Sequence, residues 1–198
     1  MAESLGIVVD DFKDWPCQFR INKYNFTPEA VGSTGVQIHT DSGFLTILQD
    51  DEKVGGLEVL DSSASFVPVP PFPGTLLVNL GDIARVSSII TPTKQKIDSA
   101  LTFITHELDH AIVMHMQVWS NGRFCSLIHR VQCKEATKRF SIATFMLAPR
   151  NRNVEAPEEL VNKDHPRLYR PFIYEDYRKL RVSNKMHTGE ALELLRLS

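Results

Sequence analysis

The sequence predicts a mainly β protein in which short antiparallel strands form a sandwich, barrel or jelly roll, followed by a helical tail. Two observations carry this prediction. Short apolar or alternating runs rich in Val, Ile, Leu, Phe and Thr fill residues 36–82 and 119–149, and tight turns such as those at 41–43 and 120–122 separate them. Strands do not alternate with helices in these two blocks, as they would in a parallel sheet.

The chain changes character at about Ala156, where strand patterns give way to helical spacing and paired charges. The stretches YEDYRKLR and GEALELLRL are the clearest examples. We therefore expect residues 150–198 to form a tail of short helices packed against the strand core.

The composition argues against several classes of protein. The 198 residues include 22 Lys and Arg against 24 Asp and Glu, so bulk charge does not favour a nucleic-acid partner. No run approaches the roughly 18 apolar residues of a membrane span, and the acidic N-terminus lacks a secretory pattern. Three cysteines, Cys17, Cys125 and Cys133, are too few for a disulfide framework. These features predict a cytoplasmic protein without membrane partners and indicate no oligomeric state.

A candidate metal site begins with His39 and Asp41, which one residue separates in a predicted strand. The two-residue period of a strand puts both side chains on one face, where an imidazole and a carboxylate can reach one cation. Such triplets are also common in exposed strands, so the pair alone identifies no site. His129, in the apolar run FCSLIHRV, is the candidate third ligand, although a lone histidine there is more often a core residue.

A candidate carboxylate site lies in the following strand. Arg139 and Ser141 are two residues apart, so a guanidinium fork and a hydroxyl share one face. An exposed edge strand with a surface arginine would give the same pattern. Tyr24 lies at strand spacing from Asn22 and could donate to a second carboxylate. Two carboxylate-binding groups beside a metal site are the arrangement expected for a dicarboxylate that also chelates the metal.

These motifs together resemble one family of enzymes. The matching residues are His39-Thr40-Asp41, His129-Arg130-Val131, Arg139-Phe140-Ser141 and Asn22-x-Tyr24, with WSNGRF at 119–124 and GTLLVNLGD at 74–82. They resemble plant Fe(II)/2-oxoglutarate-dependent dioxygenases of the isopenicillin N synthase-like class. Longer stretches, including GVQIHTDSGFLTILQDDEKVGGLEV, are similar to the dioxygenases for auxin oxidation. The resemblance covers residues 1–85 and 118–198.

The resemblance implies a double-stranded β-helix (jelly-roll, cupin-like) domain over residues 15–149, after an N-terminal remnant at 1–14 and before the C-terminal tail. It also implies a role for each candidate residue. His39, Asp41 and His129 would bind Fe(II), Arg139 and Ser141 would bind the far carboxylate of 2-oxoglutarate, and Tyr24 would bind its other end.

The reaction that the resemblance implies is the oxidation of a small organic acid by O₂, coupled to conversion of 2-oxoglutarate to succinate and CO₂. For the auxin subfamily the implied substrate is indole-3-acetate, and ascorbate is the implied reductant. The residues that bind the substrate are not apparent from the sequence.

The chain departs from the family in two places. Family members carry a long N-terminal section before the Asn-x-Tyr region, and here only about twenty residues precede it. Asp41 and His129 also lie much further apart than in the family, and removing residues 86–117 restores the family spacing. Val86-Ser87 is what the splice-site sequence GTAAGT encodes, and Gln117 is what CAG encodes. The sequence therefore predicts that 86–117 is a translated intron, extruded from the fold as a poorly ordered segment.

Two other hypotheses remain. Because of the two departures, the chain could be a folded dioxygenase-like β-shell with impaired catalysis. Residues 106–110 also match H-E-x-x-H, in which His106 and His110 would bind zinc and Glu107 would act as the base of a hydrolase. Against the hydrolase, no Gly-x-x-His follows the motif, and His115 falls off the helical face of its histidines.

Overall fold

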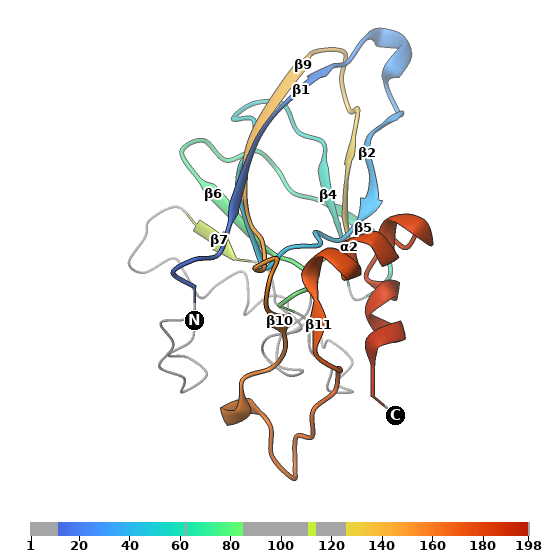
Figure 1. The fold of residues 1–198 in the computed structure, drawn as a ribbon. Helices are drawn as coiled ribbons and strands as arrows, with labels where there is room; N and C mark the ends of the chain where they lie inside the picture. Colours follow the sequence, from blue (N-terminus) through green and yellow to red (C-terminus); the bar gives the residue numbers. More distant parts are fainter. Residues whose placement is uncertain (1–11, 62, 85–110, 114–125, 198) are drawn as a thin grey trace.

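The computed structural model describes residues 12–61, 63–84, 111–113 and 126–197. Two β-sheets face each other, a five-stranded sheet of order β1-β9-β3-β6-β7 and a four-stranded sheet of order β2-β8-β4-β5 (Figure 1). Their strands are β1 (Cys17–Asn25), β2 (Thr34–His39), β3 (Leu45–Gln49), β4 (Leu57–Leu60), β5 (Phe66–Pro68), β6 (Leu76–Leu80), β7 (Ala111–Val113), β8 (His129–Gln132) and β9 (Lys138–Met146). The predicted mainly β fold is confirmed, and all described strand pairs but one are antiparallel.

The longest ladder joins β1 to β9 and sets one wall of the space between the sheets. It pairs Cys17 with Met146 at one end and Asn25 with Lys138 at the other without a register shift. Because side chains alternate along a strand, one set from β1 and β9 faces the opposite sheet and the other set faces outward. The alternation along β9 is visible in its burial, since Arg139 is buried and its neighbour Phe140 is exposed.

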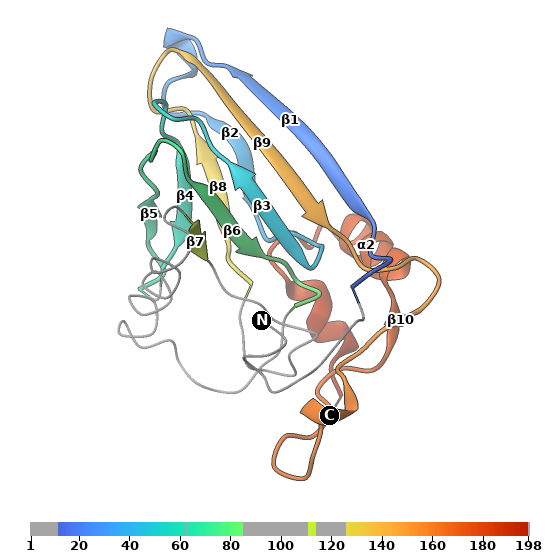
Figure 2. The same ribbon diagram turned by 90° about the vertical axis from the view of Figure 1, so that its left-hand side faces the viewer.

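The outward set forms an apolar face on the five-stranded sheet, which Figure 2 shows face-on. Phe19 and Ile21 of β1 are 63% and 65% exposed, and Phe140 of β9 is 46% exposed. Ile47 of β3 and Leu76 of β6 continue the exposed face across the sheet. Because these large side chains are exposed in the described part of the chain, their apolar area contributes little hydrophobic stabilisation there.

The segment 86–117 is described only at Ala111–Val113, which forms β7 and pairs in parallel with β6. These three residues lie in the sheet and not in the extruded segment that the sequence predicts. A strand at an open edge offers unpaired backbone groups to any neighbouring chain, which is the physical reason for such pairing. The rest of 86–117, including the H-E-x-x-H motif, lies outside the described residues, and its intron origin stays a prediction.

The C-terminal tail is less helical than the sequence predicts. It contains one α-helix, α2 (Tyr174–Ser183), two 3₁₀ helices, η3 (Glu158–Leu160) and η4 (Glu190–Leu195), and the antiparallel pair β10 (Asn153–Val154) and β11 (Phe172–Ile173). A further 3₁₀ turn, η2 (Pro28–Ala30), joins β1 to β2. Strands of two residues carry too little pattern to be recognised in a sequence.

The tail covers one end of the sandwich and buries the larger of two apolar cores (Figure 1). Tyr174 and Tyr177 of α2 pack there with Phe44 and Ile83 from the strand region, and all four are at most 2% exposed. A smaller core lies between the sheets and contains Leu57, Leu77 and Val131. Among the described residues, no helix is long and apolar enough to cross a membrane.

Candidate metal centre and co-substrate site

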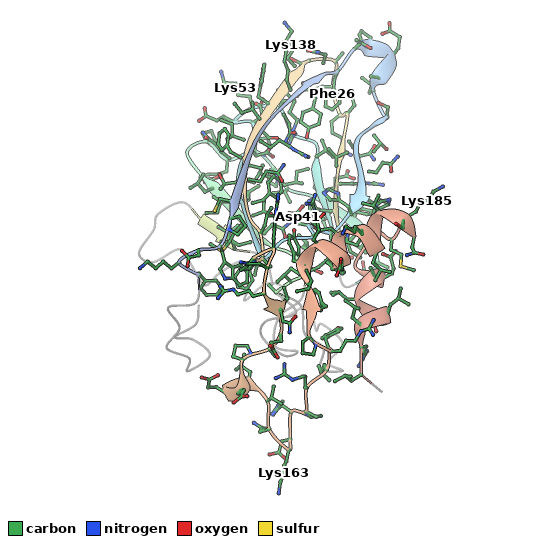
Figure 3. All side chains as sticks on the ribbon, viewed as in Figure 1. Phe26, Asp41, Lys53, Lys138, Lys163 and Lys185 are labelled. Atoms are coloured by element: carbon green, nitrogen blue, oxygen red, sulfur yellow. The ribbon has the colours of Figure 1, made fainter. Side chains whose placement is uncertain are left out.

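The three predicted metal ligands meet at the end of the sandwich next to the tail. β2 and β8 are antiparallel, and their register pairs His39 directly with His129. The two imidazole rings therefore lie side by side, with 4.2 Å between their centroids. Asp41 lies two residues after the end of β2. Figure 3 shows Asp41 in the half of the sandwich next to the tail, whereas Lys53 and Lys138 mark the other end of the sandwich at the top of the view.

The ligand atoms of these residues converge on one point. Asp41 Oδ1 lies 3.6 Å from His39 Nε2 and 3.9 Å from His129 Nε2, and all three ligand atoms lie within 4.8 Å of one another. Two imidazoles and one carboxylate on one side of an ion are the donor set of a non-haem Fe(II) site with open positions. The side chains present therefore fit the metal that the sequence predicts.

Backbone carbonyls fix the orientation of both imidazoles. His39 Nδ1 lies 2.8 Å from the carbonyl oxygen of Gln37, and His129 Nδ1 lies 3.0 Å from that of Leu127. A carbonyl only accepts, so each Nδ1 carries the proton and each Nε2 presents its lone pair to the site. In both cases the carbonyl belongs to the residue two positions before the histidine, and this repeated geometry prepares both rings as ligands.

Two polar side chains hold the carboxylate of Asp41. Thr46 Oγ1 donates to Asp41 Oδ2 at 2.6 Å, and Asn79 Nδ2 donates to the same oxygen at 2.8 Å. Oδ2 is thereby satisfied, and Oδ1 is left to face the two imidazoles. Sequence reasoning missed both residues. The available signal was a polar residue in the interior of each of the apolar runs FLTILQ and TLLVNL.

The protonation states at the site suit metal binding. Burial alone would raise the pKa of Asp41, but the nearby His129 and His39 and the hydrogen bond from Thr46 outweigh burial and lower it. Burial lowers the pKa of His129, although the Asp41 charge opposes this shift. At neutral pH the carboxylate is therefore charged and the His129 imidazole neutral, which are the forms that bind a metal ion.

The predicted co-substrate residues line the same cavity as the metal ligands. This cavity has a volume of about 110 Å³, and all six predicted residues line it: His39, Asp41, His129, Arg139, Ser141 and Tyr24. Arg139 and Ser141 belong to β9, and Tyr24 of β1 pairs with Arg139 across the ladder. The structure thus brings together side chains from four strands and both sheets.

Arg139 is the deepest cation of this cavity. Its side chain is 1% exposed, and the guanidinium carbon lies 5.0 Å from the centre of the Tyr24 ring. One terminal nitrogen, Nη2, donates to Asp50, whereas Nε and Nη1 have no hydrogen-bond partner in the described structure. Buried donors without partners are costly, so the site fits an anion that would accept from them.

The two other co-substrate candidates have different surroundings. Ser141 Oγ accepts a hydrogen bond from Asn22 Nδ2 at 3.2 Å, which links the two motifs across the ladder. The Tyr24 ring also lies 5.5 Å from that of Phe26, so this ring is packed on two sides. Donation from the Tyr24 hydroxyl to 2-oxoglutarate stays a prediction.

A second cavity of about 290 Å³ adjoins the metal ligands on the side of the tail. His39 and Asp41 line both cavities. Basic side chains from β1 and α2 surround this second space, in particular Arg20 and Arg178. This second cavity is not apparent from the sequence, because the two arginines are far apart along the chain.

Neither of the two described cysteines lines the candidate site. Cys17 is exposed, Cys133 is buried, and both are free thiols. Cys125 lies outside the described residues.

The paired sheets and the His-Asp-His cluster are features of iron oxygenases that use 2-oxoglutarate. The chain belongs to the 2OG-Fe(II) oxygenase superfamily, whose sequence pattern matches residues 15–148. Within that superfamily it is 50% identical to the 2-oxoglutarate-dependent dioxygenase DAO of Oryza sativa subsp. indica, over 98% of this chain and 55% of that protein. The family resemblance that the motifs indicate is confirmed.

Solved structures support the same relationship. The rice dioxygenase for auxin oxidation matches with a TM-score of 0.80 at 49% identity, over 99% of this chain and 56% of that one. A dioxygenase for auxin oxidation from Arabidopsis thaliana, in complex with 2-oxoglutarate, matches with a TM-score of 0.64 at 52% identity, over 84% of this chain and 51% of that one. The chain therefore spans about half the length of the relatives it matches.

Proposed function

We propose that the protein is an Fe(II)- and 2-oxoglutarate-dependent dioxygenase that oxidises a small organic acid, with indole-3-acetate as the first candidate substrate. One observation carries the proposal. Three convergent metal-ligand atoms share a cavity with a buried arginine whose Nε and Nη1 have no partner among the described residues. That combination suits a metal chelated by a dicarboxylate whose far end binds Arg139.

The side chains would divide the work as follows. His39, Asp41 and His129 would hold Fe(II) through their three ligand atoms, which are the donor set of non-haem Fe(II) sites that accept further ligands. Arg139 and Ser141 orient 2-oxoglutarate by its far carboxylate. The bound metal, 2-oxoglutarate and O₂ supply the oxidising chemistry, with succinate and CO₂ as products and ascorbate as the reductant that maintains Fe(II).

The choice of an acid as substrate rests on the second cavity and on the relatives. Arg20 and Arg178 give this cavity, which borders the metal ligands, a basic lining suited to a carboxylate. The rice and Arabidopsis relatives at about half identity are dioxygenases for auxin oxidation. Auxin catabolism in the cytoplasm, a reducing compartment for Fe(II) and free thiols, is the corresponding cellular role.

Succinate production tests the proposal directly. The purified chain is incubated with Fe(II), ascorbate, O₂ and 2-oxoglutarate, with and without indole-3-acetate. We expect succinate to form in step with oxidation of indole-3-acetate and to disappear when the metal is chelated. Binding of metal and 2-oxoglutarate without succinate would support the impaired β-shell instead.

Arg139→Lys tests the co-substrate residue. An ammonium group is a point charge and cannot reproduce the two-donor contact of a guanidinium. We expect the KM for 2-oxoglutarate to rise by the equivalent of about 2–4 kcal/mol, because charge-assisted contacts to a buried anion are lost. Arg150→Lys, at an exposed position, is the matched control and should leave KM unchanged. An unchanged KM in Arg139→Lys would mean that another cation binds the co-substrate.

A further inference from the structure

Asp50 is a buried carboxylate that the proposed function does not use. It directly follows β3, whose last residue, Gln49, pairs with Ile142 of β9. This pairing brings Asp50 to the start of β9, where its Oδ1 accepts from Nη2 of Arg139. The Asp50 side chain is 8% exposed and that of Arg139 is 1% exposed, so the ion pair is shielded from water.

A carboxylate at this position is unfavourable by itself. Burial raises the pKa of Asp50, and the positive charge of Arg139 offsets only part of that rise. Oδ1 also accepts the backbone N–H of Asp51 at 2.9 Å, but Oδ2 is buried and has no partner in the part of the chain that the structure describes. Buried ionic groups of this kind contribute little net stability, because desolvation opposes their attraction. A role other than stability is therefore indicated.

The contacts of Arg139 show what that role can be. Asp50 holds one terminal nitrogen, and the Tyr24 ring lies 5.0 Å from the guanidinium carbon. Together these contacts restrict the rotation of a long side chain that otherwise has many rotamers. Within the described ranges, Nε and Nη1 are the guanidinium nitrogens left without a partner.

The neighbouring residue holds the backbone at the same place. Asp51 Oδ2 accepts the N–H of Phe140 at 2.9 Å, and its Oδ1 accepts the N–H groups of Lys53 and Val54. Asp51 thereby fixes the turn after β3 to the residue that follows Arg139. The two adjacent acids have separate tasks, since Asp51 binds main chain and Asp50 binds the guanidinium.

We infer that Asp50 is a positioning residue, which holds the Arg139 guanidinium in the orientation that binds the far carboxylate of 2-oxoglutarate. The inference rests on the proposed function and adds to it a residue to which the sequence analysis assigns no role. The opposite role is also chemically conceivable, in which Asp50 competes with 2-oxoglutarate for Arg139. The two roles predict opposite changes in the affinity for 2-oxoglutarate when Asp50 is replaced. Removing a positioning group weakens co-substrate binding, whereas removing a competitor strengthens it.

The experiment compares Asp50→Asn with Glu52→Gln, an exposed acid two residues away that controls for the change in net charge. The full chain is loaded with Mn(II), and 2-oxoglutarate is titrated by calorimetry. We expect Asp50→Asn to bind 2-oxoglutarate at least tenfold more weakly than the unmodified chain, with Mn(II) affinity unchanged. Glu52→Gln should bind like the unmodified chain. Where turnover is measured, KM for 2-oxoglutarate should rise while kcat changes little.

Asp50→Glu provides a second variant, because it retains the charge but displaces the carboxylate by one methylene. It should also weaken 2-oxoglutarate binding while Mn(II) still binds, which distinguishes positioning from loss of folding. Unchanged or tighter binding in Asp50→Asn or Asp50→Glu would overturn the inference. Failure of the unmodified chain to bind 2-oxoglutarate would instead overturn the proposed function.

Discussion

Asp41→Ala is expected to abolish metal-dependent turnover and to weaken Mn(II) or Fe(II) binding by more than about 100-fold. Groups that only support a ligand are worth roughly 10- to 100-fold in metal affinity, so loss of a ligand itself should exceed that range. The remaining donors would be the two imidazoles of His39 and His129, which hold Fe(II) poorly without the carboxylate. Metal affinity is measured by calorimetry or by quenching of intrinsic fluorescence.

A graded series makes this result specific. Thr46→Val removes the 2.6 Å hydrogen bond to Asp41 Oδ2 but keeps the ligand, so it should show an intermediate loss of roughly 10- to 100-fold. Ser42→Ala, next to the ligand in sequence, is the control, because its hydroxyl contacts Tyr174 and not Asp41. Asp41→Ala with unchanged metal affinity would show that the cluster is not a metal site.

Arg181→Ala is expected to have the largest effect on stability. Arg181 of α2 reaches into the strand core, where its Nη1 donates to the fully buried carboxylate of Asp82. Its Nη2 donates at 2.9 Å to the backbone carbonyls of Thr40 and His187. Removing one partner of a buried ion pair leaves an uncompensated charge, which costs about 3–5 kcal/mol. The loss should appear as a lower urea midpoint of unfolding.

Arg181→Ala should also affect the candidate metal centre. Arg181 binds the carbonyl of Thr40, and the backbone N–H of Asp82 donates to the carbonyl of Asp41 at 2.8 Å. We therefore expect weaker metal binding as well as lower stability. Lys179→Ala is the control on the same helix, because its side chain is 67% exposed and pairs only across the surface with Asp176. Equal stability of the two variants would contradict the structural role assigned to Arg181.

The side chains that line the inner strand faces could be identified from sequence. Strand spacing alone places Arg139 with Ser141 on one face of β9, because the two-residue period is a local property. Asp41 follows the end of β2 and is not in the strand that the sequence predicts for it, although its side chain still meets that of His39. Their assembly into one site depends on strand pairings such as that of β2 with β8, which local spacing does not show. The family resemblance supplied that information.

The groups that support these side chains could not be identified in the same way. Asp50 follows a strand, where an acid is an ordinary turn residue, and its partner Arg139 comes from a strand far along the chain. Arg181 is one of several charged residues in a helical stretch, and its burial depends on how the tail packs. Such contacts are set by tertiary packing, which has no periodic signature.

The candidate metal ligands and the candidate co-substrate arginine belong to different sheets, and in the proposed binding mode this separation bears on selectivity. His39 and His129 lie on β2 and β8, whereas Arg139 lies on β9 of the facing sheet. A diacid held at both ends must therefore match the width of the gap between the sheets. Leu57, Leu77 and Val131 of the small core pack between the sheets and maintain that width. In the proposed binding mode the small apolar core would set the distance between the metal ligands and Arg139, and would therefore favour a diacid of one chain length over shorter or longer ones.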